Sequence, residues 1–177
     1  MQDDGARLFT ALWPEPALRA RLCDERDGWR WPPGAKPVAD ANLHLTLHFL
    51  GALSRLRVAA LDGALAMLPV VPTTLRALAP ELWRGGIAVL RFATADSALA
   101  ELHAGIGRVL SELGVALDPR PFAPHVTLAR RARGAVPPAV PATLEWRVGG
   151  FALIESLPGQ RASYRVLRSY GDEPPAP

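Results

Sequence analysis

The sequence predicts an α+β fold in which most strands pair in antiparallel fashion. Segments with strand-like alternation follow one another without an intervening helix in the middle of the chain and again at its end, and such runs favour antiparallel neighbours. Helical spacing of apolar residues marks three segments. The 177 residues are 49% hydrophobic, which is enough to build a substantial core in one domain or in two small lobes.

The first expected elements are a strand over residues 7–12 and a helix over residues 16–27. Pro16 suits the first turn of a helix, because the N–H that proline lacks has no partner there. Leu18 and Leu22 lie four residues apart and therefore share one helical face. The chain thus opens with a strand followed by an amphipathic helix.

A loop rich in proline and glycine, between Trp31 and Asn42, leads into an expected strand over residues 42–51. Ser54 is a suitable N-cap for a second helix, and Pro69 ends that helix. The apolar face of this helix consists of Leu61, Leu65 and Leu68. The strand and the helix after it repeat the order with which the chain begins.

Residues 73–79 and 87–92 are expected to form a hairpin with an unusually long connection, which turns at residues 83–86. A third helix is expected over residues 96–113, with Gly114 as its stop. Its apolar stripe consists of Leu99, Leu102, Ile106, Leu110 and Leu113. This is the most regular helical pattern in the chain.

Three further strands are expected over residues 124–130, 145–155 and 163–167. Residues 171–177 are expected to form a disordered tail. The resulting domain organisation is a single domain over residues 1–170 followed by this tail.

The composition indicates the cellular compartment more clearly than it indicates the function. The net charge of +3 allows an anionic partner without identifying one, because the arginines form no long basic run and Lys36 is the only lysine. Cys23 is the only cysteine, which fits a reducing compartment, and we expect it to be a small buried residue. Residues 1–4 include two acids and no apolar run, so we expect no signal peptide, and no stretch has the apolar length of a membrane span. We therefore expect a soluble, cytoplasmic monomer without a membrane partner.

The main functional signal is a short motif that occurs twice. His44-Leu45-Thr46-Leu47 reappears 81 residues later as His125-Val126-Thr127-Leu128. On a strand, residues two apart point to the same face and lie about 6.5–7 Å apart. Each histidine therefore shares a face with its threonine, while the residues between them point into the core. One imidazole and one hydroxyl from each strand can reach a single phosphate-sized group from two sides.

A metal site is the other functional reading of the same residues. It needs three or more ligands, usually histidine, cysteine or carboxylate. His48 is the candidate third ligand, but the acidic residues near the motifs are few: Asp40 and Asp62 flank the first, and Asp118 precedes the second. We therefore expect neither a metal nor another cofactor.

These residues also carry a family resemblance. The paired motifs, the preceding Asn42-Leu43, the trailing Phe49-Leu50-Gly51 and the segment from Phe122 to Arg130 resemble the two-histidine phosphoesterases, and most closely their RNA 2',3'-cyclic phosphodiesterase (LigT-like) branch, the "2'-5' RNA ligase" family. The resemblance implies two similar lobes around a central groove, each an antiparallel sheet with helices on its outer face. It also implies metal-independent hydrolysis of 2',3'-cyclic phosphates, at RNA ends or on nucleotides, to a 2'-phosphate.

The resemblance assigns a role to each motif residue. His125 is expected to activate water as the base and His44 to protonate the leaving 3'-oxygen as the acid, although chemistry alone does not fix this order. Thr46 and Thr127 are expected to donate hydrogen bonds to the phosphate. Arg130 is the best candidate for a further phosphate contact, but strict alternation from His125 turns it to the other face.

Other residues are candidates for the walls of the groove. His48 shares the face of His44 and either lines the groove or is solvated; it also stands where relatives carry a basic residue. Trp29, Trp31 and Phe122 either stack on bases or pack internally. His103 is expected to be an ordinary helix-edge residue.

Three alternative functions stay open at this point. One is a non-catalytic protein that binds RNA ends in the same groove. Another is a phosphoesterase of the same kind that acts on a different small cyclic phosphate or on 2'-5' RNA linkages. The third is a metal-dependent hydrolase, whose activity a strong chelator would abolish.

Overall fold

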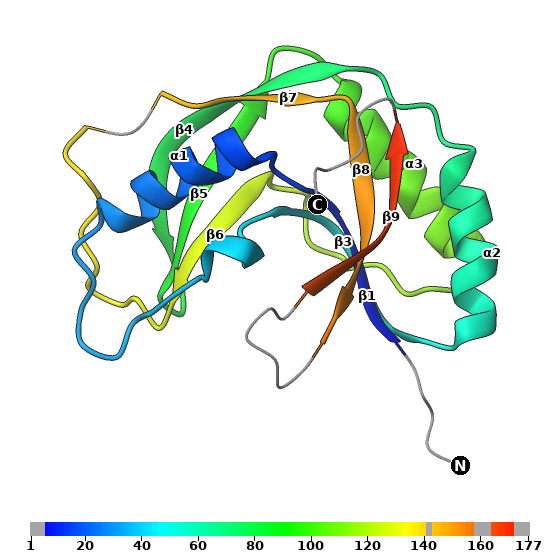
Figure 1. The fold of residues 1–177 in the computed structure, drawn as a ribbon, viewed down its shortest axis with the longest axis horizontal. Coiled ribbons are helices and arrows are strands. Elements are labelled where there is room, and N and C mark those ends of the chain that lie inside the picture. The colour runs from blue at the N-terminus through cyan, green and yellow to red at the C-terminus, as the bar shows by residue number, and fades with distance from the viewer. Residues whose placement is uncertain (1–5, 141–142, 158–163, 172–177) are drawn as a thin grey trace.

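The computed structural model describes residues 6–140, 143–157 and 164–171 (Figure 1). The helices in these ranges are α1 (Pro16–Asp27), α2 (Arg55–Ala66), α3 (Ala98–Glu112) and the short 3-10 helix η1 (Asp40–Asn42). The strands in the same ranges are β1 (Ala6–Leu12), β2 (Lys36–Pro37), β3 (Leu45–Leu53), β4 (Thr73–Trp83), β5 (Ile87–Thr94), β6 (His125–Arg130), β7 (Glu145–Val148), β8 (Gly150–Ser156) and β9 (Tyr164–Gly171). The expected α+β class is confirmed.

The strands form one strongly curled antiparallel sheet that consists of two halves. Its order is β7-β4-β5-β6-β3-β1-β8-β9, and β2 adds to the outer end of β6. Within the described residues, β6 and β3 share a single register pair, Leu45 with Val126. The sheet therefore divides at this seam into two lobes, as the resemblance implied: one consists of β7, β4, β5 and β6 with the short β2, and the other of β3, β1, β8 and β9.

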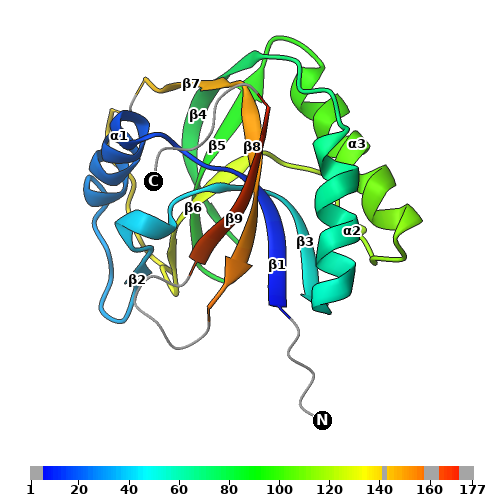
Figure 2. The ribbon, with the colours of Figure 1, turned by 45° about the vertical axis from the view of Figure 1, so that its right-hand side comes forward.

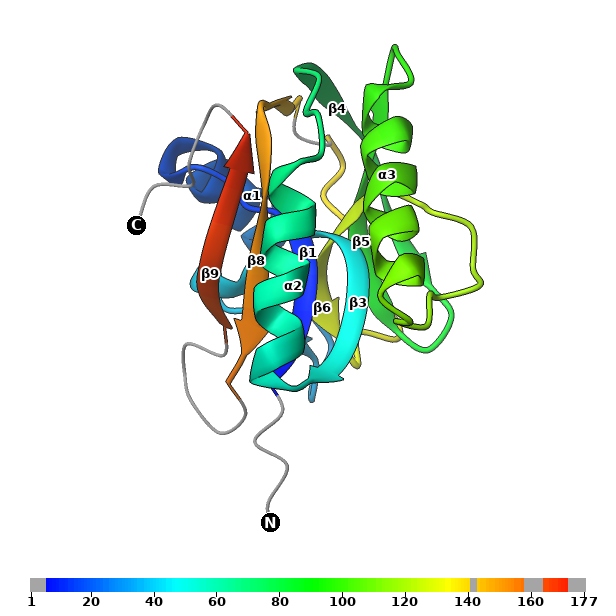
Figure 3. The ribbon, with the colours of Figure 1, turned by 90° about the vertical axis from the view of Figure 1, so that its right-hand side faces the viewer.

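The helices lie on opposite sides of the molecule. In Figures 1 and 3, α2 and α3 run side by side while α1 lies at the far side. α1 buries Leu18 and Leu22, as expected from their spacing. α3 approaches β3 closely, because a Cβ on Gly107 would lie only 3.4 Å from Cε1 of His48. Gly107 thus allows close packing of α3 on the sheet.

The hairpin of β4 and β5 is longer and tighter than the sequence suggested. β4 runs to Trp83, and β5 begins at Ile87. The prediction of a long connection was wrong, because β4 continues through Pro80 to Trp83. The structure accommodates Pro80 at a register irregularity between Ala77 and Pro80, where the missing N–H breaks no regular ladder.

The single strand expected over residues 145–155 is in fact two strands in different lobes. β7 pairs with β4, whereas β8 pairs with β1. The chain bends at Gly149 and crosses from one lobe to the other (Figure 2). The prediction was wrong because strand-forming apolar residues continue on both sides of the bend, so composition alone does not reveal it.

Smaller differences occur at the ends of elements. Ser54 precedes α2 at the N-cap position, although its side chain makes no capping hydrogen bond. Cys23 is half-buried and packs against the core. Gly171 belongs to β9 instead of the expected tail, and residues 172–177 lie outside the described part. No helix among the described residues is long and apolar enough to span a membrane.

Candidate active site

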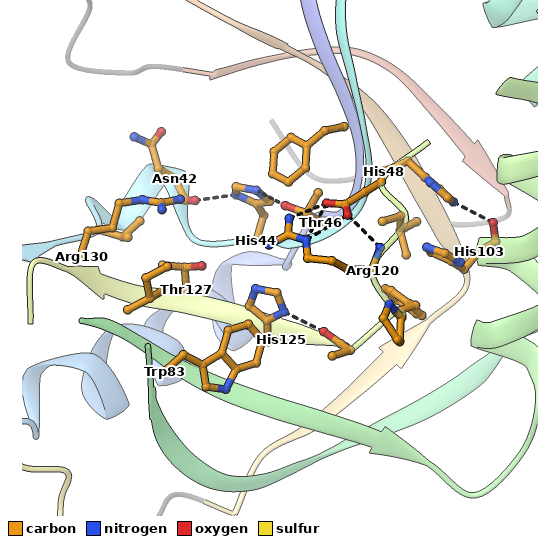
Figure 4. A pocket seen from close by; sticks show the side chains of 18 of the residues that line it. Asn42, His44, Thr46, His48, Trp83, His103, Arg120, His125, Thr127 and Arg130 are labelled. Atoms are coloured by element: carbon orange, nitrogen blue, oxygen red, sulfur yellow. Dashed lines mark hydrogen bonds and ion pairs between the residues drawn. The ribbon is translucent and has the colours of Figure 1, made fainter. Parts of the chain in front are cut away.

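A groove lies where the two lobes meet, and both motifs line it (Figure 4). Its floor comes from the first residues of β3 and from β6 on either side of the seam. Its walls come from the segments before each motif strand, from the end of β4 and from the start of β9. The motif residues in the groove are His44, Thr46, His125 and Thr127. The structure therefore brings together the four side chains that were expected to share a face.

The two motifs are related by approximate twofold symmetry. Because Leu45 pairs with Val126 in antiparallel register, His44 lies opposite Thr127, and Thr46 lies opposite His125. Leu45 and Val126 are both fully buried, so the alternating residues point out of the core and into the groove. Each histidine thus has a threonine two residues along its own strand and another across the seam.

Both histidines are oriented by the same kind of hydrogen bond. Nδ1 of His44 donates to the carbonyl of Asn42 at 2.7 Å, and Nδ1 of His125 donates to the carbonyl of Ala123 at 2.7 Å. A carbonyl can only accept, so the proton must be on Nδ1 in each ring. This leaves Nε2 as the atom that exchanges a proton with a bound group. At His44, Nε2 lies 2.9 Å from Oγ1 of Thr46.

Aromatic rings surround His44. The centroid of its ring lies 4.9 Å from that of Phe9, 5.8 Å from Trp13 and 5.2 Å from Tyr164. Burial among these rings lowers the pKa of His44 to about 4, and the positive charge of Arg19 contributes in the same direction. The ring is therefore neutral at pH 7 until a negative charge enters the groove.

His125 has a less enclosed environment in the other lobe. Its ring centroid lies 4.4 Å from that of Trp83. Burial lowers the pKa of His125, and Arg91 adds to this shift. Glu81 fixes both neighbours, since it accepts a hydrogen bond from Nε1 of Trp83 at 2.7 Å and lies 3.4 Å from Nη1 of Arg91. Trp83 was not predicted as a groove residue, because its sequence context indicated a turn.

Arg130 also lines the groove, which corrects the expectation that it points away. Ala88 and Val89 are adjacent on β5, but they pair with Ala129 and Thr127, which are two residues apart on β6. This bulge adds one residue to β6 and reverses the alternation after Thr127. Arg130 therefore returns to the same side as the motif residues (Figure 4).

The family is shown by comparison with known proteins. The family model described as the 2'-5' RNA ligase superfamily matches residues 14–160, most of the chain. The chain belongs to this superfamily. An RNA 2',3'-cyclic phosphodiesterase of Thermus thermophilus is 37% identical over 185 aligned positions, which cover 93% of this chain and 89% of that protein. An RNA 2',3'-cyclic phosphodiesterase of Escherichia coli is 32% identical over 73% of this chain and 74% of its own length.

Solved structures of the superfamily share the whole fold. The crystal structure of Escherichia coli LigT complexed with 3'-AMP superposes with a TM-score of 0.82 at 29% identity, covering 95% of this chain and 98% of that one. The structure of TT0787 of Thermus thermophilus gives a TM-score of 0.76 at 30% identity and covers 93% and 97% of the two chains. The chain is thus a LigT-like member of the two-histidine phosphoesterases.

His48 does not lie on the same face of the motif strand as His44, contrary to expectation. Ala11 pairs with Thr46, but the adjacent Thr10 pairs with His48, so β3 carries an extra residue at Leu47. This bulge turns His48 away from His44. Its ring is buried at 7% exposure and packs under α3 at the margin of the groove. The reading as a solvated residue is therefore wrong.

A stack of three rings closes this margin of the groove. The ring centroids of His48 and His103 lie 3.9 Å apart, and those of His103 and Phe122 also lie 3.9 Å apart. Nε2 of His48 lies 2.9 Å from the carbonyl of His103. His103 thus does more than mark a helix edge, since it joins α3 to the segment that leads into β6. Phe122 lines the groove, as one of its two readings anticipated.

The two tryptophans near the first motif do not lie in the groove. Trp29 is 4% exposed, and its ring stacks on Trp31 with centroids 5.1 Å apart. Neither belongs to the groove lining, and both pack in or against the core, in line with the internal-packing reading. Among the described residues, no group of three or more histidine, cysteine, aspartate or glutamate side chains lies close enough together to hold a metal ion.

Arg19 connects α1 to the segment that carries the first motif. Its Nη1 donates to the carbonyls of Asp40 at 2.8 Å and Leu43 at 3.1 Å, and its Nη2 donates to the carbonyl of Pro14 at 3.2 Å. These bonds fix the chain immediately before His44. The fork of the guanidinium is needed for this, because a lysine cannot reach several carbonyls in one plane.

We predict that Arg19→Gln lowers kcat/KM about tenfold, since the segment that orients His44 loses three hydrogen bonds. The same change removes a positive charge near His44, so the pKa of His44 rises from about 4 towards its ordinary value. NMR titration of the His44 ring protons measures this shift. Arg19→Lys is the matched control: it keeps the charge and loses the fork, so activity falls while the titration midpoint stays low. Equal midpoints in the two variants would contradict the prediction.

Proposed function

We propose that this protein hydrolyses 2',3'-cyclic phosphates, at RNA ends or on nucleotides, to 2'-phosphates without a metal ion. Residues 1–170 act as the single catalytic unit in this proposal. The observation that carries it is the pairing of Leu45 with Val126, which places two imidazoles and two hydroxyls around one point in the groove. The phosphodiesterase names of the relatives and the 3'-AMP complex of LigT support the same reaction.

The proposed reaction uses one histidine on each side of the phosphate. Nε2 of His125 accepts a proton from water as the water oxygen attacks phosphorus. The bond from phosphorus to the 3'-oxygen breaks, and His44 gives the proton on its Nε2 to that oxygen. The product keeps its phosphate on the 2'-oxygen. Both rings stay oriented throughout, because their Nδ1–H groups remain bonded to the carbonyls of Asn42 and Ala123.

The acid role requires His44 to be charged when the substrate is bound. The pKa of about 4 makes the ring neutral at pH 7, as burial and nearby cations dictate. A cyclic phosphate brings a negative charge beside the ring, and this charge favours the imidazolium. The substrate therefore raises the pKa of the group that must protonate it. Without substrate, the neutral ring costs less to bury.

The hydroxyl of Thr46 follows the protonation of His44. It donates to Nε2 while the ring is neutral, at a distance of 2.9 Å. Once Nε2 carries a proton it no longer accepts, and the hydroxyl is free to donate to a phosphate oxygen. Thr127 supplies the matching donor from the other lobe, and Arg130 adds a positive charge at the same end of the groove. Donors placed where charge develops are the main electrostatic contribution to such reactions.

Groove-wall residues supply contacts to the nucleoside in this proposal. Phe122 and Trp83 both line the groove, with Phe122 stacked on His103 and Trp83 beside His125. Either ring can stack on a base. A non-catalytic RNA-end binder is the rival, but it would need only donors and no pair of proton-exchanging rings.

The test is incubation of the purified protein with an RNA oligonucleotide that ends in a 2',3'-cyclic phosphate, in the presence of a strong chelator. Phosphorus NMR reads the position of the product phosphate. We expect a 2'-phosphate at an unchanged rate with and without chelator. A 3'-phosphate product would contradict the assignment of the leaving group, and loss of activity in chelator would favour the metal-dependent alternative. Binding without hydrolysis would favour the RNA-end binder.

A further inference from the structure

Positive charge is distributed unevenly along the chain. The segments 28–39, 82–90 and 121–140 contain six cationic side chains and no acidic residue. The six are Arg30, Lys36, Arg84, Arg130, Arg131 and Arg133. They give these segments a charge of +6 and leave −3 on the rest of the chain, although the total is only +3. The modest net charge therefore conceals a strongly basic region.

The fold brings the three segments together at one end of β6. Lys36 of β2 pairs with Arg130 of β6. The N–H of Ala132 donates to the carbonyl of Gly86 at 2.8 Å, which joins the segment after β6 to the turn that carries Arg84. A Cβ on Gly86 would lie 2.9 Å from the backbone nitrogen of Arg133, so the two segments touch.

Arg30 extends the same region on its far side. It forms an isolated antiparallel bridge with Val136, with its backbone N–H donating at 2.9 Å to the carbonyl of that residue. Arg130 lines the groove itself. The cations therefore continue from the groove outward, beyond the pair of motifs. We call the set Arg30, Lys36, Arg84, Arg131 and Arg133 the basic face.

The basic face is solvent-exposed and its charges are not neutralised. All five side chains are exposed, and none forms an ion pair with an acidic residue in the described part of the chain. Two arginines closer to His125 differ in this respect, because Arg91 pairs with Glu81 and Arg120 with Asp118. Clustered positive charges repel one another, and a bound polyanion would neutralise several of them at once.

We propose that the basic face binds the phosphate backbone of the RNA strand that leads to the cyclic phosphate. This proposal rests on the proposed function and narrows its substrate to RNA ends over free cyclic nucleotides. A 2',3'-cyclic mononucleotide has no further phosphate and gains nothing from these side chains. Contacts to successive phosphates add affinity without reading the sequence of bases.

The experiment compares two substrates that share the same terminal nucleoside: a 2',3'-cyclic mononucleotide and an oligonucleotide ending in a 2',3'-cyclic phosphate. The variant carries Arg84→Gln, Arg131→Gln and Arg133→Gln. We expect the ratio of kcat/KM for the oligonucleotide to that for the mononucleotide to fall about tenfold or more at low salt. The slope of log kcat/KM against log salt for the oligonucleotide should become shallower by about 0.7 for each phosphate that the variant no longer binds.

A matched control removes the same charge elsewhere. Arg76→Gln, Arg108→Gln and Arg147→Gln lie on β4, α3 and β7 and are exposed. This control should keep the wild-type ratio and the wild-type salt slope. An equal fall of the ratio in both variants, or no fall in the basic-face variant, would overturn the proposal. Thermal melts of both variants show whether each one is folded.

Failure of the proposed function gives a different pattern. In that case the wild-type protein hydrolyses neither substrate, and the basic face is tested by binding alone. Fluorescence anisotropy with an oligonucleotide that ends in a 2'-phosphate supplies this readout. A loss of affinity of about tenfold in the basic-face variant, absent from the control, supports the surface, and equal affinities overturn it.

Discussion

Replacing either histidine of the groove by alanine is expected to lower the rate of cyclic phosphate hydrolysis by about 10²–10⁴. His44→Ala removes the proposed acid and His125→Ala the proposed base, and each leaves the core intact because both side chains point into the groove. The two losses should not add fully in the double variant, since the rings act in one proton-transfer sequence. Steady-state kinetics on folded protein measure the effect. Activity close to wild type in either variant would contradict the assignment of that histidine to the reaction.

The two roles can be separated with a substrate whose 3'-oxygen is replaced by sulfur. A thiolate leaves without being protonated, because a thiol is far more acidic than a ribose hydroxyl. The sulfur substrate should therefore restore most of the activity of His44→Ala and little of that of His125→Ala. The opposite pattern would exchange the roles of acid and base while keeping both residues in the mechanism.

The second large effect is expected at the paired threonines. Thr46→Val and Thr127→Val each remove one hydrogen-bond donor while keeping the shape of the side chain. We expect each change to lower kcat by about 10–10², which is less than the loss of about 10²–10³ on removal of one oxyanion donor. The double change should lower kcat by up to about 10³. Thr→Ser at the same positions keeps the hydroxyl and is the matched control. If the valine variants raise KM and leave kcat unchanged, the donors bind the ground state and the transition state equally.

The sequence predicted the positions of the motif side chains in the groove better than those of the residues around them. Alternation on two strands was sufficient to place His44 beside Thr46 and His125 beside Thr127, because the strands are regular over those residues. Alternation failed immediately afterwards, at His48 and at Arg130. In both places a bulge inserts one residue, at Leu47 and between Thr127 and Ala129, and reverses the side chains that directly follow. Bulges leave no reliable mark in a single sequence.

The same limit explains the missed aromatic residues. Phe9, Trp13 and Tyr164 contact His44 from β1, from the residue after it and from β9. Phe9 and Trp13, which directly follows β1, are four residues apart, and this even spacing on an extended chain was a usable signal for side chains on the same side. The placement of β9 was not predictable, because it depends on the crossing at Gly149 that carries the chain to the other lobe.

The seam between β3 and β6 has a consequence for turnover. The described residues of the two half-sheets share one register pair there, and each half contributes one imidazole and one hydroxyl. A phosphate held by both sets is thus a cross-link between two bodies that the backbone itself joins weakly at this point. Tight closure aligns the reacting groups but also retains the product, so the same four side chains set both the chemical step and the escape of the 2'-phosphate. The turnover rate in such a groove therefore depends on two opposed requirements: tight binding of the reacting phosphate and fast dissociation of the product.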